Sequence, residues 1–113
     1  MSNDAEALLA MTTLPNRASA ERIAAALVEA RAAACVSILA ECTSVYRWQG
    51  KTETASEVPL LIKTTRAAWP LLESTILAQH PYELPELIAV PVTTGLPAYL
   101  QWVAQETTSS GKP

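Results

Sequence analysis

The chain has 113 residues, of which 50% are hydrophobic, so it suffices for one domain with one core and is not a disordered chain. Its formal net charge is −3 and its basic residues are scattered, which argues against nucleic acid or an anionic membrane as a partner. No apolar segment approaches the roughly 20 residues of a membrane span and no secretory signal is visible, so we expect a cytoplasmic protein.

The first two predicted elements are a buried strand and an amphipathic helix. Residues Glu6 to Thr13 form a short apolar run, which Pro15 ends. Asn16 or Ser19 can cap the helix that follows, and the sequence does not choose between them. The helix is expected to run to Ala34, because apolar residues recur at helical spacing. These residues are Ile23, Ala26, Leu27, Ala30 and Ala34.

A long hairpin is predicted from Cys35 to Thr65, with a tight turn at Gln49-Gly50. Each arm has about 15 residues and would reach roughly 50 Å, whereas a compact domain of this length is only about 35 Å across. The hairpin should therefore overhang its own domain. Its exposed strand edges then need a partner, and the simplest partner is another copy of the chain.

Because side chains alternate between the two faces of a strand, every second residue of each hairpin arm is expected on the same face of that arm. On the first arm this face carries Val36, Ile38, Ala40, Cys42, Ser44, Tyr46 and Trp48, and on the second it carries Val58, Leu60, Ile62 and Thr64. On a continuous strand, Cys35 and Cys42 lie on opposite faces about 23 Å apart, which excludes a disulfide between them. Pro59 cannot donate a ladder hydrogen bond, so it marks an edge position or a bulge.

The second half of the chain repeats the pattern of a helix followed by a strand. A helix with the apolar stripe Trp69, Leu72 and Ile76 is expected at 67–79, a proline-stiffened loop at 80–85, a last core strand at 86–93 and a short helix from Pro97. This order predicts an α+β, ferredoxin-like split βαβ fold, with both main helices on one face of an antiparallel sheet. We expect a single domain over 1–113, with a core of about 6–106 and a flexible C-terminal tail at 107–113.

A set of motifs is similar to a known family. The motifs are Tyr46-x-Trp48-x-Gly50-Lys51, Glu57, Leu61-Ile62-Lys63-Thr64-Thr65, His80-Pro81-Tyr82-x-x-Pro85-Glu86 and Tyr99-Leu100-x-Trp102. In this order they resemble the CutA family of divalent-cation tolerance proteins, from about Ala10 to Val103. The resemblance implies a ferredoxin-like protomer in a tight homotrimer. It also implies a role linked to copper(II) or another divalent cation, no organic cofactor and no established enzymatic reaction.

The resemblance also implies which positions bear on metal binding. In the bacterial members linked to copper, a Cys ends the first strand and two adjacent histidines precede the Pro-Tyr. This chain has Thr12, Gln79 and His80 at those positions, so one imidazole remains of the ligands that copper prefers. His80 is the candidate metal ligand, with a loop contact to backbone or carboxylate as the alternative. Cys35 is the candidate thiol ligand, with a small core residue as the alternative.

A second candidate site gathers polar side chains from a strand and a loop. Glu57 and Lys63 share the face opposite the aliphatic one, and Tyr82 and Glu86 lie just before the last strand. If the His80 loop folds over this face, these groups form a pocket for a cation or a small anion, and the alternative is an ion-pair network between subunits.

Four kinds of function are considered for this chain. The leading hypothesis is a non-catalytic trimer that binds divalent cations or signals their presence. The alternatives are a signalling or regulatory trimer that binds a small anionic metabolite, and a scaffold that anchors an unidentified protein partner. An enzyme is the least supported, because the chain has no nucleophile elbow, triad order or metal motif.

Overall fold

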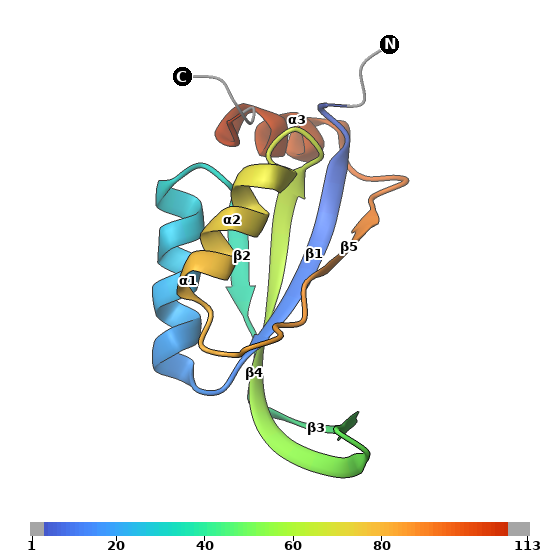
Figure 1. Ribbon diagram of the computed structural model, residues 1–113. Helices are drawn as coiled ribbons and strands as arrows, with labels where there is room; N and C mark the ends of the chain where they lie inside the picture. The colour runs from blue at the N-terminus through green and yellow to red at the C-terminus, as the bar shows by residue number, and fades with distance from the viewer. Residues whose placement is uncertain (1–3, 109–113) are drawn as a thin grey trace.

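The computed structural model describes residues 4–108 and consists of five strands and three helices (Figure 1). The strands are β1 (Ala7–Leu14), β2 (Cys35–Ile38), β3 (Cys42–Trp48), β4 (Lys51–Thr65) and β5 (Ile88–Pro91). The helices are α1 (Arg17–Glu29), α2 (Trp69–Gln79) and α3 (Pro97–Glu106). The strands form one antiparallel sheet in the order β2-β4-β1-β5, and β3 also pairs with β4. The predicted α+β, ferredoxin-like fold is confirmed.

The hydrophobic core lies between the sheet and helices α1 and α2, which cover the same face of the sheet (Figure 1). Alternate residues of β1 and β4 point into it, as the period of two along a strand requires. Its fully or almost fully buried side chains include Ala10, Leu14, Val58, Leu60, Ile62, Ile23, Leu27, Leu72 and Ile76. The predicted core face of the second hairpin arm and the apolar stripe of α2 are thus confirmed.

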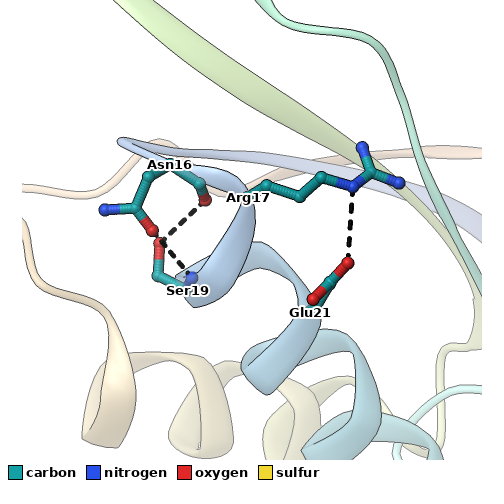
Figure 2. Close-up of polar contacts among 4 residues, drawn as sticks. All are labelled: Asn16, Arg17, Ser19 and Glu21. Carbon is teal, nitrogen blue, oxygen red and sulfur yellow. Dashed lines mark hydrogen bonds and ion pairs between the residues drawn. The ribbon is translucent and has the colours of Figure 1, made fainter.

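Helix α1 begins at the Asn16 cap (Figure 2). The Ser19 amide donates a 2.8 Å hydrogen bond to the Asn16 side chain, so Asn16 rather than Ser19 is the N-cap. The helix ends at Glu29, because Arg31 takes a left-handed conformation with φ of 62°. The predicted continuation to Ala34 is therefore wrong.

The first arm of the predicted hairpin is two strands rather than one. The pairing of β2 and β3 with β4 differs in register by one residue, since Ile38 lies opposite Leu60 but Cys42 lies opposite Glu57. Three residues of the first arm, 39–41, therefore face two residues of β4, and this is a β-bulge. One of those two is Pro59, which fits the expectation that this proline marks a bulge.

The bulge reverses the faces of β3 relative to β2. Ile38 packs against the core, whereas Cys42 shares the opposite face with its pairing partner Glu57. The single continuous face predicted for the first arm is therefore wrong. Cys35, opposite Lys63, also lies on the face away from the helices, which corrects the prediction that the two cysteines occupy opposite faces. Both remain free thiols, since their partners on β4 are six residues apart, about 20 Å along the strand.

The tip of the hairpin extends beyond the body of the domain. Gln49 and Gly50 form the two-residue turn with φ of 52° and 82°, and two left-handed residues match the twist of the flanking strands. Figure 1 shows β3 and the start of β4 curving away below the helices, and the molecule measures 45 Å along its longest axis against 29 and 24 Å. The overhang expected from the sequence is present.

The C-terminal elements differ from the prediction mainly in length. Helix α2 begins at Trp69 with Pro70 in its first turn, and β5 has four residues instead of the eight expected at 86–93. The Thr108 amide donates to the Arg31 carbonyl at 2.8 Å, and residues 109–113 of the predicted tail lie outside the described residues. Within residues 4–108, no helix is long and apolar enough to cross a membrane.

The Asn16 cap gives a direct test of what positions α1. Asn16→Ala removes the acceptor of the Ser19 amide, and we expect the free energy of unfolding to fall by about 1 kcal/mol. The matched control is Glu21→Gln, which breaks the exposed Arg17–Glu21 ion pair of 3.4 Å and should cost at most about 0.5 kcal/mol. Urea unfolding at one fixed protein concentration measures both values, and equal losses would contradict the role of the cap.

Candidate functional site

The carboxylate of Glu57 is the centre of the candidate site. Glu57 is only 8% exposed, and its Oε2 accepts hydrogen bonds from the Tyr82 hydroxyl at 2.8 Å and from the Thr13 hydroxyl at 3.2 Å. The three side chains come from β4, from the loop after α2 and from β1. Thr13 was not predicted, because a threonine in a strand gives no sign of whether its hydroxyl bonds a neighbouring strand.

The register of the sheet explains how Thr13 reaches Glu57. Thr13 pairs with Pro59, and Glu57 is two residues further along β4 on the same face. Such diagonal neighbours across an antiparallel pair are within reach of each other's side chains. The face is the one away from α1 and α2, so the site and the core share the same strands but lie on opposite faces.

His80 connects the loop after α2 to β1, and each of its ring nitrogens makes a hydrogen bond to a backbone group. Its Nε2 lies 2.8 Å from the Thr13 carbonyl oxygen, and its Nδ1 accepts the Tyr82 amide at 3.1 Å. Because Nδ1 accepts, the proton is on Nε2, which donates to the carbonyl. A metal ion at Nδ1 would have to displace the Tyr82 amide, so the contacts match the alternative of a loop histidine bonded to backbone.

Tyr82 is held as a neutral hydrogen-bond donor. Burial raises the pKa of its phenol well above the ordinary value, and the hydrogen bond and negative charge of Glu57 raise it further. The ring also packs against that of His80, with the two centroids 4.9 Å apart. Tyr82 therefore donates to Glu57 throughout the neutral and mildly alkaline range.

An open cavity of about 970 Å³ lies beside this cluster, between β3 and the segment 81–88, which comprises the loop and the first residue of β5. It is lined by Thr13, Ser44, Val45, Tyr46, Trp48, Glu57, Pro81, Tyr82, Glu83, Leu84, Pro85, Glu86, Leu87 and Ile88. Three of these side chains are carboxylates, and among the described residues that line the cavity there is no Lys, Arg or His. The cavity is thus apolar and aromatic in its walls and negative in its charge.

The structure brings together some of the predicted site residues and separates others. Glu57, Tyr82 and Glu86 line the same cavity. Lys63 lies outside it, with its Nζ 3.1 Å from the Ser37 hydroxyl and 4.0 Å from the Cys35 sulfur. The separation follows from strand geometry, since six residues span about 20 Å. The expected pocket therefore lacks its amine, and no cation among the described lining residues is left to attract an anionic ligand.

The remaining predicted metal positions do not converge on a common point. The buried Thr12 hydroxyl donates to the Glu86 carbonyl at 2.6 Å, while Cys35 lies beside Lys63 on another part of the sheet. No three His, Cys, Asp or Glu residues within 4–108 come together as a group that could hold a metal ion. Copper prefers several converging nitrogen and sulfur ligands, so the described residues of one chain do not fit a closed copper site.

Comparisons with known proteins agree with this architecture. Residues 8–106 match the family model described as CutA1 divalent ion tolerance protein. The chain is 48% identical over 100 residues to the mouse Protein CutA, covering 88% of this chain and 56% of the mouse protein, so it spans little more than half of that relative. It is 45% identical over 97 residues to the Thermus thermophilus divalent-cation tolerance protein CutA, covering 86% and 94% of the two chains.

The fold comparison extends to solved structures. The divalent cation tolerance protein Cut A1 from Thermus thermophilus superposes with a TM-score of 0.89 at 43% identity, covering 90% of this chain and 99% of that one. The described elements therefore have the arrangement found in this solved structure, including the sheet that carries the site.

Tyr82→Phe tests the hydrogen bond to Glu57. At neutral pH we expect the free energy of unfolding to fall by about 1–2 kcal/mol, because a buried carboxylate loses a donor. The folded-state pKa of Tyr82 is raised, so the wild-type protein should lose stability as pH rises above the unfolded value of about 10, and the variant should lose less over that window. Urea unfolding at several pH values measures both effects.

The control for this experiment is Tyr46→Phe, since the Tyr46 side chain is 44% exposed on β3. It should change the free energy of unfolding by no more than about 0.5 kcal/mol at neutral pH. The assignment fails if both variants show the same alkaline profile as the wild-type protein.

Proposed function

Since the chain belongs to the CutA1 divalent ion tolerance protein family, we propose that it acts in tolerance of, or response to, divalent cations, copper among them. It does so as a homotrimer that binds metal ions without catalysing a reaction. The observation that carries the proposal is the family match over residues 8–106, together with the close fit to a solved divalent cation tolerance protein. The matching family and relatives are named for divalent-ion tolerance rather than for a reaction.

Exposed strand edges support the proposed assembly. β5 is an outer strand of the sheet, and its side chains Ile88 and Val90 are 54% and 53% exposed. The overhanging hairpin carries Val45, which is 68% exposed. Unpaired edges beside exposed apolar side chains invite pairing with another chain, and a second copy of the same edge is the simplest partner. That the assembly contains three chains is inferred from the family resemblance.

Assembly also affects how a metal-binding site could form. Because the described residues of one chain group no three ligands, a metal site of useful affinity needs ligands that converge from neighbouring chains. His80 is the imidazole available to such a site, and its Nδ1 becomes a ligand if it releases the Tyr82 amide. Both cysteines are free thiols, which accords with the reducing cytoplasm as the proposed compartment.

The assembly is tested by placing a charge on the outer strand. The wild-type protein should scatter light as a particle of three 12.1-kDa chains. Val90→Lys should shift this mass toward the single chain, because a lysine at that edge opposes a buried apolar interface. Leu77→Lys is the control, since Leu77 is similarly exposed, at 58%, but lies on α2. A wild-type monomer, or equal dissociation of both variants, contradicts the proposal.

The metal role is tested by calorimetric titration of the metal-free protein with Cu(II). We expect saturable binding by the wild-type protein and a large loss of affinity in His80→Ala, because the variant lacks the imidazole. Cys35→Ser serves as the control for thiol ligation, since the sulfur of this candidate ligand lies beside the Lys63 amine, on another part of the sheet from the His80 loop. Binding that His80→Ala leaves unchanged moves the site elsewhere, and no binding at all contradicts direct metal binding.

A further inference from the structure

We propose that the Cys35 thiol and the Lys63 amine form a reversible covalent link, a sulfenamide bond between Sγ and Nζ, when the protein meets a peroxide. Both groups belong to one chain and lie on the face of the sheet away from α1 and α2. Neither comes from β5 or from the hairpin tip, the segments that carry the proposed contacts between chains. The link therefore depends neither on the proposed metal role nor on the number of chains in the assembly.

The register of the sheet fixes this pair of side chains. Cys35 lies directly opposite Lys63 on the antiparallel strands β2 and β4, and the side chains of such partners leave the sheet side by side. The Ala34 amide donates to the Lys63 carbonyl at 2.9 Å. The buried Thr64 hydroxyl donates to the Ala32 carbonyl at 2.6 Å. These two bonds hold the segment before Cys35 against β4, so the sulfur stays within reach of the amine.

The Lys63 amine has neutral partners. Its Nζ lies 3.1 Å from the Ser37 hydroxyl and 4.0 Å from the Cys35 sulfur, and it makes no ion pair with any carboxylate within residues 4–108. An adjacent carboxylate would favour the protonated amine, which has no lone pair with which to attack sulfur. The surroundings of Lys63 therefore leave its nitrogen free to act as a nucleophile once it gives a proton to water.

The Cys35 sulfur has an amine beside it where redox-active cysteines usually have a second thiol. A cysteine that a peroxide oxidises forms a sulfenic acid, which a neighbouring thiol or nitrogen then captures. Cys42, the second thiol of the chain, pairs with Glu57, which is about 20 Å along β4 from Lys63. Cys35 is half-buried rather than enclosed, so an oxidant little larger than water can approach it. A sulfenic acid at Cys35 therefore meets the Lys63 nitrogen and not a thiol of its own chain.

The link forms in two steps that balance. First, the thiol sulfur attacks one oxygen of hydrogen peroxide, the O–O bond breaks, and the thiol proton leaves with the other oxygen as water, which gives the sulfenic acid. The deprotonated Lys63 amine then attacks the sulfur, the S–O bond breaks, and hydroxide leaves as water with a proton from the nitrogen. One thiol and one amine are joined, one peroxide is reduced and two waters are released. The linked chain has two hydrogens fewer than the reduced chain, and a thiol reductant restores them.

Proximity makes Lys63 the preferred partner of the sulfenic acid. Reacting atoms need to come within about 3–3.5 Å, so the Nζ–Sγ separation of 4.0 Å closes with a small rotation of the flexible lysine side chain. A nucleophile held at such a distance outcompetes one that must arrive from solution. Burial raises the pKa of the Tyr99 phenol on α3, and negative charge at Cys35 raises it further, so this neighbour stays neutral and does not compete. The link protects the sulfur, because further oxidation to a sulfinic acid is irreversible.

Peptide mass spectrometry tests the link in Cys42→Ser, a full-length chain in which Cys35 is the one remaining thiol. The native oligomer is treated with hydrogen peroxide, denatured with iodoacetamide and digested with trypsin. We expect the peptides 32–47 and 52–66 to be joined, with two hydrogens fewer than the two peptides together, and to separate again in dithiothreitol. The absence of this joined peptide overturns the proposal, including the case in which neighbouring chains shield the sulfur from peroxide. A link to Lys51 in place of Lys63 overturns it as well.

A lysine-to-arginine variant then separates the amine from its charge. In the Cys42→Ser background, Lys63→Arg keeps a positive charge beside the sulfur, but a guanidinium keeps its protons and is not a nucleophile. The sulfenic acid should therefore persist, and dimedone added with the denaturant should label Cys35 at least about tenfold more than in the parent chain. Equal dimedone labelling of Lys63→Arg and its parent overturns the role of the amine.

Lys51→Arg is the matched control, since Lys51 lies next to the hairpin turn and pairs with Trp48, far along β4 from Cys35. This variant should form the joined peptide to the same extent as its parent and show the same low dimedone labelling. Loss of the joined peptide in Lys51→Arg as well as in Lys63→Arg, with both oligomers intact by light scattering, contradicts a specific link at Lys63.

Discussion

The β-bulge at residues 39–41 is the constraint on which the rest of the hairpin depends. It shifts the pairing of β4 by one residue between Leu60 and Glu57, and a shift of one residue exchanges the faces of a strand. Below the bulge, β3 therefore adds its even-numbered side chains to the face that carries Glu57. The aromatic wall of the cavity and its carboxylate lie together because of this single extra residue.

Pattern-based prediction succeeded where burial controls the sequence. The alternation of Val58, Leu60 and Ile62 on β4 and the stripe of α2 identified core faces, because a buried position tolerates few residue types. It failed where one residue changes the geometry without changing the composition. No glycine marks the left-handed residue Arg31 that stops α1 after Glu29, and the extra residue of the bulge changes only the strand register, for which Pro59 was the one sign.

Prediction of the candidate site succeeded for some residues and failed for others. Glu57, Tyr82 and Glu86 could be predicted as polar residues near one another, because the loop must return past the end of β1 to start the last strand. The hydrogen bond from Thr13 to Glu57 could not be predicted, since it depends on the register of two strands that are distant in sequence. Lys63 was grouped with Glu57 because both share a face, but a shared face fixes direction and not distance, and six residues of strand separate them.

His80 illustrates how geometry decides between a ligand and a structural residue. Its two nitrogens hold the loop by bonding backbone groups of Thr13 and Tyr82, and this places the Tyr82 hydroxyl on Glu57. Recruiting its Nδ1 to a metal ion would therefore loosen the loop that forms one wall of the cavity. Within residues 4–108 no three potential ligands come together, so the proposed metal site draws on residues from neighbouring chains. Under the proposed metal role, capture of an ion at His80 and the hydrogen bond from Tyr82 to Glu57 are coupled, because the same loop carries both residues.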